Sequence, residues 1–231
     1  MRKVLILYRK NDILCFTSIK PLNFKRKFFK SNIKKLLLEL KINPSKIIFG
    51  KQIHSNKILV VEDNTKGIKK VDGFITNLKN ILLCIFTADC VPVFIYEKVI
   101  GCIGIVHCGW RGIYKGIIKN AMRKLIKNYR VRPNNLRFIL GPSIKKCCYE
   151  VSKDLIDRFK RRFKGIGIKE RGKRYYLSLD EIIKYEILKF KVPKKNIVEC
   201  KLCTFCDKTK FFSYRRDGKG TGRMLSGIIM E

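Results

Sequence analysis

The sequence is poor in histidine, tryptophan and acidic residues, and it has no long hydrophobic run. Its 231 residues include two histidines, one tryptophan and 18 aspartates plus glutamates, against 53 lysines plus arginines. Two histidines are too few to build several copper centres. No stretch approaches the ~20 apolar residues of a membrane helix, and the apolar run at residues 4–7 is shorter than the ~7–15 residues of a secretory signal core. We therefore expect no membrane partner and a reducing, cytoplasmic location for the ten cysteines.

The net charge of +35 raises the question of a nucleic-acid partner, because phosphate neutralisation dominates that kind of affinity. The basic residues are scattered through almost every segment and form no single stripe or tail. This distribution favours a background bias in residue usage and predicts no specific nucleic-acid partner, although a basic binding protein stays open as an alternative. The positive field would still attract phosphate-bearing substrates.

The hydrophobic pattern predicts one domain of mixed secondary structure. No linker rich in Ser, Pro or Gly divides the chain. Because strands and helices do not alternate regularly, we expect an α+β fold, a layered α/β sandwich with mixed sheets, spanning residues 1–231. Strands are expected at 4–7, 13–16, 47–49, 58–61, 81–86, 91–96, 103–107, 136–140, 197–200, 211–214 and 225–229. Helices are expected after Ser31, over 113–129, after Ser152, and from Asp180 as N-cap.

Both histidines lie in short polar motifs at the ends of apolar runs. His54 lies in Gln52-Ile53-His54-Ser55 and His107 in Val106-His107-Cys108-Gly109, while Thr87-Ala88-Asp89-Cys90 lies between them. Two imidazoles and one thiolate make a catalytic zinc set with one open coordination position. The spacing is too wide for a zinc finger, and no further histidine exists to close the set. From the residues alone, three unrelated polar side chains are an equally good interpretation.

A longer series of motifs follows in order along the chain. It comprises Lys51 to Ser55, Val71-Asp72-Gly73, Thr87 to Pro92, His107 to Gly112, Gly141-Pro142-Ser143 through Cys148-Tyr149-Glu150-Val151, Cys203-Thr204, and Phe212 through Arg216-Asp217-Gly218 to Arg223-Met224. Together these motifs resemble the laccase-domain family of purine nucleoside phosphorylases, also called polyphenol oxidase or peptidoglycan editing factor proteins. The resemblance covers residues 47–231, and the N-terminal segment 1–46 diverges from it.

The resemblance implies a layered sandwich that holds zinc at His54, Cys90 and His107, copper being the less expected ion. It also implies phosphorolysis of adenosine, inosine and methylthioadenosine, and deamination of adenosine. We expect a monomer or homodimer. We expect Cys90 and His107 to be catalytic as well as metal-binding. A metal-free Cys90–His107 pair acting as hydrolase or deamidase, cell-wall precursor editing included, stays open as an alternative.

Three arginines are candidates for binding the anionic substrate. Arg111 is expected to be catalytic, and Arg215 and Arg216 to bind substrate, because planar bidentate donors suit phosphate. A salt bridge or a solvated turn is an equal interpretation for any one of them.

The remaining candidates are Asp89, Gln52 and Trp110. Asp89 is expected to be catalytic, orienting a metal-bound water or hydrogen-bonding a ligand histidine, with a role in a turn equally open. Gln52 is assigned to substrate binding, although loop packing explains it as well, and Trp110 is expected to be a core anchor. The run Cys200-x-x-Cys203-x-x-Cys206 is not expected to bind an iron–sulfur cluster, because it lacks the next cysteine and proline of the bacterial pattern and because strand alternation would turn its side chains apart.

Overall fold

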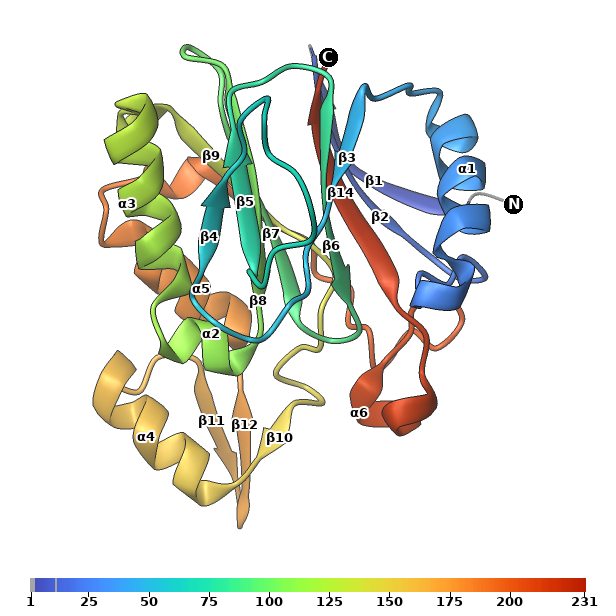
Figure 1. Ribbon diagram of the computed structural model, residues 1–231. Coiled ribbons are helices and arrows are strands. Elements are labelled where there is room, and N and C mark those ends of the chain that lie inside the picture. Colours follow the sequence, from blue (N-terminus) through green and yellow to red (C-terminus); the bar gives the residue numbers. More distant parts are fainter. Residues whose placement is uncertain (1–2, 11) are drawn as a thin grey trace.

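The computed structural model describes residues 3–10 and 12–231, which fold into two face-to-face sheets covered by helices on both outer sides (Figure 1). The strands are β1 (Val4–Lys10), β2 (Ile13–Ser18), β3 (Lys46–Ile48), β4 (Ile58–Val60), β5 (Gly73–Thr76), β6 (Ile81–Thr87), β7 (Val91–Glu97), β8 (Cys102–Cys108), β9 (Leu136–Leu140), β10 (Glu150–Val151), β11 (Ile168–Arg171), β12 (Arg174–Leu177), β13 (Ile197–Glu199) and β14 (Met224–Met230). The α-helices are α1 (Phe29–Leu40), α2 (Trp110–Tyr114), α3 (Ile117–Tyr129), α4 (Lys153–Phe163), α5 (Leu179–Leu188) and α6 (Tyr214–Asp217).

Both large sheets are mixed. One has the order β1-β2-β14-β6-β3, antiparallel except for the parallel pair β3 and β6. The other has the order β13-β9-β7-β8-β5-β4, with parallel pairs at its two edges. This arrangement confirms the expected layered α+β fold with mixed sheets in one domain.

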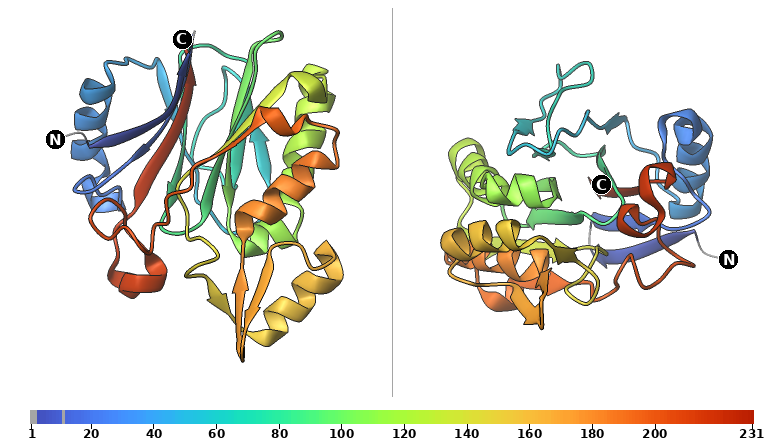
Figure 2. Two further views of the ribbon diagram at one scale, coloured as in Figure 1. Left: turned by 180° about the vertical axis from the view of Figure 1, so that it is seen from behind. Right: turned by 90° about the horizontal axis from the view of Figure 1, so that it is seen from below.

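The core consists of three apolar layers. Phe74, Phe94 and Ile105 meet Leu83 and Ile228 between the two sheets. Helices α2, α3 and α5 cover the outer face of the six-stranded sheet, while α1 covers the outer face of the five-stranded sheet (Figure 2). Burial of these side chains at roughly 25 cal/mol per Å² is the main stabilising contribution, and it makes the strand ends rigid supports for a site.

A third sheet of short strands, β10-β12-β11, lies with α4 at one end of the sandwich (Figure 1). The sequence analysis missed all three strands and β5. Three of the four residues of β11 are exposed, so no alternation of buried and exposed positions reveals that strand.

Three local predictions were wrong. The helix expected over 113–129 is divided into α2 and α3, because Gly116 adopts a positive φ of 79° at the break. The N-cap of α5 is Ser178, whose hydroxyl oxygen accepts the N–H of Glu181, whereas Asp180 lies buried in the first turn. Residues 211–214 form no strand and lead instead into the short helix α6.

Candidate metal centre

The two histidines and Cys90 meet at one end of the sandwich. His54 lies in the loop between β3 and β4, Cys90 in the turn between β6 and β7, and His107 near the end of β8. Their ligand atoms all lie within 4.8 Å of one another. His107 is buried at 4% exposure, Cys90 is half-buried and His54 is exposed, so the set faces outward.

Asp72, a residue to which the sequence analysis gave no role, organises two of the three ligands. Its fully buried carboxylate accepts the backbone N–H groups of Ile53 (3.2 Å), His54 (3.0 Å) and Ser55 (2.7 Å), and the Ser55 hydroxyl (2.7 Å). These bonds hold His54 in a left-handed conformation with φ of 54°. Asp72 also lies 2.9 Å from Nδ1 of His107, which leaves the other ring nitrogen free as a ligand.

The three titratable groups influence one another. Burial by itself would raise the pKa of Asp72, but hydrogen bonds from His107 and Ser55 outweigh burial and lower that pKa to about 2. Burial would lower the pKa of His107, yet the neighbouring Cys90 and Asp72 raise it to about 9. Burial and the nearby His107 lower the pKa of His54. The cluster thus combines a firmly ionised carboxylate, a thiol and two imidazoles.

Gly109 gives the ligands room. A Cβ at this position would lie 2.9 Å from Nδ1 of His54 and 3.0 Å from Sγ of Cys90, closer than real Cβ contacts. The absence of a side chain here lets the imidazole and the thiol approach each other against the start of α2.

A cleft of about 650 Å³ opens above the ligands. Its lining combines glycine, aromatic and basic residues with the ligand set: Gly50, Gln52, His54, Phe86, Ala88, Asp89, Cys90, His107, Gly109, Trp110, Arg111, Tyr149, Tyr214, Arg215 and Arg223. This volume falls in the range of small-molecule sites.

Two of the three predicted arginines line the cleft, each against an aromatic ring. The guanidinium of Arg111 lies 4.3 Å from the ring centroid of Trp110, and that of Arg215 lies 5.0 Å from the ring centroid of Tyr149. Arg215 also donates from Nη1 to the carbonyl of Glu150. Stacking of this kind fixes the plane of a guanidinium and leaves its edge free to donate.

Arg216 is placed differently from the substrate-binding role expected for it. It does not line the cleft, and its guanidinium makes five hydrogen bonds: two to the carboxylate of Asp217 and three to the carbonyls of Thr204, Phe205 and Phe211. A guanidinium has five N–H donors, so these bonds use all of them. In this structure Arg216 fastens the loop that leads to Arg215.

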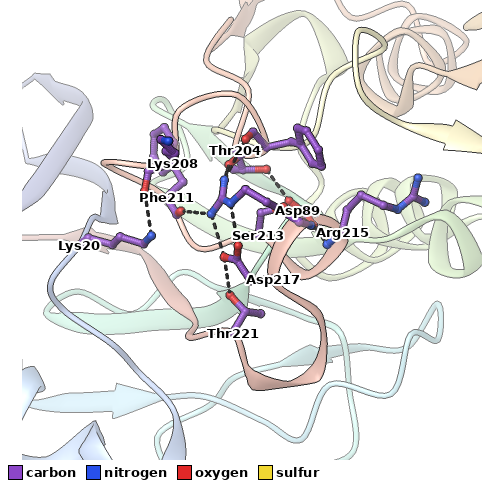
Figure 3. Close-up of polar contacts among 11 residues, drawn as sticks. Lys20, Asp89, Thr204, Lys208, Phe211, Ser213, Arg215, Asp217 and Thr221 are labelled. Carbon is purple, nitrogen blue, oxygen red and sulfur yellow. Dashed lines mark hydrogen bonds and ion pairs between the residues drawn. The ribbon is translucent and has the colours of Figure 1, made fainter.

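Asp89 likewise holds this loop (Figure 3). Its carboxylate accepts the hydroxyls of Thr204 (2.7 Å) and Ser213 (3.1 Å) and the backbone N–H of Arg215 (2.7 Å). The contact with a ligand histidine that was expected of Asp89 is made by Asp72 instead. Asp89 borders the cleft, and its bonds determine where Arg215 lies.

Gln52 and Trp110 lie in the cleft wall. The side-chain amide of Gln52 donates to the carbonyl of Phe86 (2.8 Å) and accepts its N–H (2.7 Å), which is the packing interpretation of that residue. Trp110 is half-buried and packs against the core while lining the cleft. Arg223, Tyr149 and Tyr214 lie in the motifs quoted above but were given no role, since only the fold brings them to the same cleft.

The match to a protein-family model decides which family this is. Residues 25–231 match the model described as multi-copper polyphenol oxidoreductase laccase. The chain belongs to this laccase-like family. The match begins at residue 25 and therefore includes part of the segment that the sequence analysis had set apart as divergent.

Relatives in the laccase-like family carry enzymatic names. A purine nucleoside phosphorylase of Clostridium acetobutylicum is 35% identical over 191 residues, which cover 82% of this chain and 79% of the relative. An adenosine deaminase from an unknown prokaryotic organism is 27% identical over 209 residues, covering 85% and 79%. The crystal structure of the hypothetical protein YfiH of Bacillus licheniformis aligns with a TM-score of 0.93 at 28% identity and covers 99% of this chain and 97% of that one.

The donor set fits a single transition-metal ion. Two imidazole nitrogens and one thiolate suit zinc and also copper, and the ligand atoms are close enough to share one ion. The word multi-copper in the family description finds no support in the two histidines of this chain, because several copper sites need more imidazoles.

Proposed function

We propose that the protein is a zinc-dependent purine nucleoside phosphorylase that acts on adenosine, inosine and methylthioadenosine, with adenosine deamination as a second activity. The observation that carries this proposal is the meeting of His54, Cys90 and His107 at the floor of a cleft bordered by arginines. The names of the relatives supply the substrate class.

His54, Cys90 and His107 would hold the zinc ion. When bound, zinc supplies Lewis-acid polarisation of a substrate oxygen or of water. Asp72 keeps the His107 ring turned with Nδ1 toward its own carboxylate and thereby presents the other nitrogen to the ion. This arrangement pre-organises the ligands before substrate enters.

Phosphate would bind between Arg111 and Arg215. Both guanidinium groups border the cleft, and their free N–H donors suit the paired oxygens of phosphate. In phosphorolysis a phosphate oxygen forms a bond to C1′ of the ribose while the bond from C1′ to the purine nitrogen breaks. The arginines would hold the attacking oxygen in line, and the purine takes up a proton as it leaves.

The aromatic side chains of the cleft would receive the base. Phe86, Tyr149 and Tyr214 border the same space as the arginines, and flat apolar rings favour stacking with a purine. Deamination is an attack on a different carbon: water would add to the adenine carbon that bears the amino group, ammonia would leave, and inosine would remain. For that reaction the base, and not the ribose, would lie toward the ligand set, and a cleft that receives adenosine in either orientation is our reason for proposing both activities.

We place the protein in the cytoplasm as part of this proposal. All ten cysteines are free thiols in the structure, as is usual in a reducing compartment. Among the described residues, no helix is both long and apolar enough to cross a membrane.

The test is an assay of the purified protein with adenosine, inosine and methylthioadenosine, each with and without phosphate, followed by separation of the products. We expect free base and a pentose 1-phosphate only when phosphate is present, and inosine from adenosine without it. Cys90→Ala should abolish both reactions, because it removes the only sulfur ligand of the set, while circular dichroism shows a folded protein.

Cys200→Ser is the matched control, because Cys200 lies outside the cleft lining and outside the ligand set; it should turn over like the parent. Full activity in Cys90→Ala would refute the assignment. Activity of the parent protein that survives complete zinc removal would favour a metal-free pair of Cys90 and His107.

A further inference from the structure

A second group of sulfur atoms lies outside the catalytic cleft. Cys147 and Cys148 lie between β9 and β10, and Cys203 and Cys206 lie in the loop between β13 and α6. The four Sγ atoms all lie within 4.8 Å of one another. The sequence analysis expected no iron–sulfur cluster at 200–206 and assumed an extended strand there. In the structure residues 201–206 form a loop with turns. Cys203 and Cys206 therefore converge with the adjacent pair Cys147 and Cys148 from another segment.

We propose that these four cysteines bind one structural zinc ion, separate from the ion of the catalytic set. Four thiolates with no open position are the donor set of closed structural zinc sites. Chains with Cys-x-x-Cys pairs from two segments commonly build such sites, and here Cys203-x-x-Cys206 supplies one half while the adjacent pair Cys147-Cys148 supplies the other.

The distances suit one ion. A zinc–sulfur bond of ~2.3 Å in a tetrahedron separates neighbouring sulfurs by ~3.8 Å. The structure places Sγ of Cys147 3.8 Å from Cys206 and 3.5 Å from Cys148, and Sγ of Cys148 3.2 Å from Cys206. An iron–sulfur cluster, which inserts several iron and sulfide atoms between its thiolates, needs sulfurs further apart.

The backbone near Cys203 contacts its sulfur. The N–H of Lys145 donates to Sγ of Cys203 at 3.4 Å. Hydrogen bonds of this kind orient a ligand toward a bound metal ion.

The ion would join two loops that border the catalytic cleft. Thr204, between two of the cysteines, donates to Asp89 next to Cys90, and Asp89 also binds the N–H of Arg215. Tyr149 follows Cys148 directly and lines the cleft. A zinc ion here would therefore act on catalysis as a positioning element, by holding Arg215 and Tyr149 in place.

The decisive measurement uses the Cys90→Ala chain, because it lacks the sulfur ligand of the proposed catalytic set, so that a metal bound by thiolates in this chain must lie elsewhere. After expression with zinc and dialysis, elemental analysis should give about one zinc per chain. Cobalt in place of zinc should give the intense sulfur-to-cobalt charge-transfer absorption of a four-thiolate site. The double variant Cys90→Ala/Cys206→Ser should lose most of the zinc, while the matched control Cys90→Ala/Cys200→Ser keeps it.

Two results would overturn the proposal. One is a Cys90→Ala chain that binds no zinc and whose four thiols react freely or form a disulfide on non-reducing mass spectrometry. The other is a cobalt spectrum without thiolate charge transfer. If Cys206→Ser prevents folding, the stoichiometry and spectrum of Cys90→Ala decide by themselves. Neither readout depends on activity, so failure of the catalytic proposal would leave this one intact.

Discussion

The two ligand clusters of this molecule use cysteine in opposite ways. The proposed catalytic set of His54, Cys90 and His107 contains one sulfur and two imidazoles, lies beside β7 and β8 and in the loop before β4, and opens into a cleft of about 650 Å³. The four-cysteine cluster lies in irregular loops and offers sulfur only. Three ligands leave a position for chemistry, whereas four close the shell, so the number of ligands is the basis on which we propose a reactive ion at one cluster and a structural ion at the other.

The supports of the clusters differ as well. The catalytic set rests on Asp72, a fully buried carboxylate with five hydrogen bonds, and on strands packed in the core. Cys147 and Cys206 are exposed, and the loop of Cys206 is held by backbone turns and by the bonds of Asp89 and Arg216 to it. We therefore expect substitutions near each cluster to affect zinc at that cluster alone.

The largest difference between the two clusters in the change of zinc affinity should come from Asp72→Asn. The amide keeps the shape but loses the negative charge, and its NH2 group would face the N–H donors that Asp72 now accepts. Loss of such a partner of a ligand histidine typically weakens metal affinity ~10–100-fold. Competition with a chelating dye should show this loss at the catalytic set and unchanged affinity at the four cysteines.

The control for Asp72→Asn is Asp154→Asn, an exposed aspartate on α4, which should change neither affinity. If Asp72→Asn weakened both clusters equally, a general loss of structure would explain the effect, and the independence of the clusters would be contradicted.

A smaller effect is expected from Gly109→Ala. The backbone at Gly109 has φ of −83° and ψ of 163°, which any residue adopts, so only the contacts of the new methyl group with His54 and Cys90 matter. Overpacking costs about 1–3 kcal/mol, and because the exposed His54 can shift away from the new methyl group, we expect the lower end of this range, which corresponds to roughly 5- to 10-fold weaker zinc binding at the catalytic set. Isothermal titration of the zinc-free protein measures it.

Gly220→Ala is the matched control for Gly109→Ala, because a Cβ there meets nothing within 4 Å. Equal zinc affinities in the two alanine variants would show that the ligands have room to move, and that Gly109 is not needed for their approach.

The sequence predicted the layers of the fold better than their details. Long apolar runs such as those of β6, β7 and β8 are buried along their whole length or nearly so, and a buried strand leaves a clear hydrophobic signal. The short strands β10 to β12 and the break at Gly116 leave no clear hydrophobic signal. Strand β11 consists mostly of exposed residues, and the break depends on the backbone conformation of Gly116. The sequence also could not show that Ser178, and not Asp180, is the N-cap of α5, since serine and aspartate both cap helices.

The proposed ligand set could be named from the sequence because histidine is rare here and because the motifs around His54, Cys90 and His107 resemble a known family. The partners of those ligands could not. Asp72 and Asp89 are both single acids in polar motifs, and only the fold shows that Asp72 binds His107 while Asp89 binds Thr204 and Ser213. The four cysteines escaped notice for a related reason: their two pairs are more than fifty positions apart, and strand geometry was assumed for a segment that forms a loop.

The smallest effect on activity should come from Arg111→Gln. This substitution removes a positive charge at the cleft and leaves the residues of both ligand clusters unchanged. Arg111 is exposed, so solvent screens its attraction for phosphate to at most ~1 kcal/mol, equivalent to a roughly three- to fivefold rise in the KM for phosphate. Zinc content should stay as in the parent, because Arg111 contacts Trp110 and no ligand sulfur. The control is Arg123→Gln, because Arg123 is exposed on α3 and lies outside the cleft lining. This substitution removes the same charge and should leave the KM for phosphate unchanged. An equal rise of that KM in both variants would assign the effect to the overall field of this +35 chain and would contradict a phosphate site at Arg111.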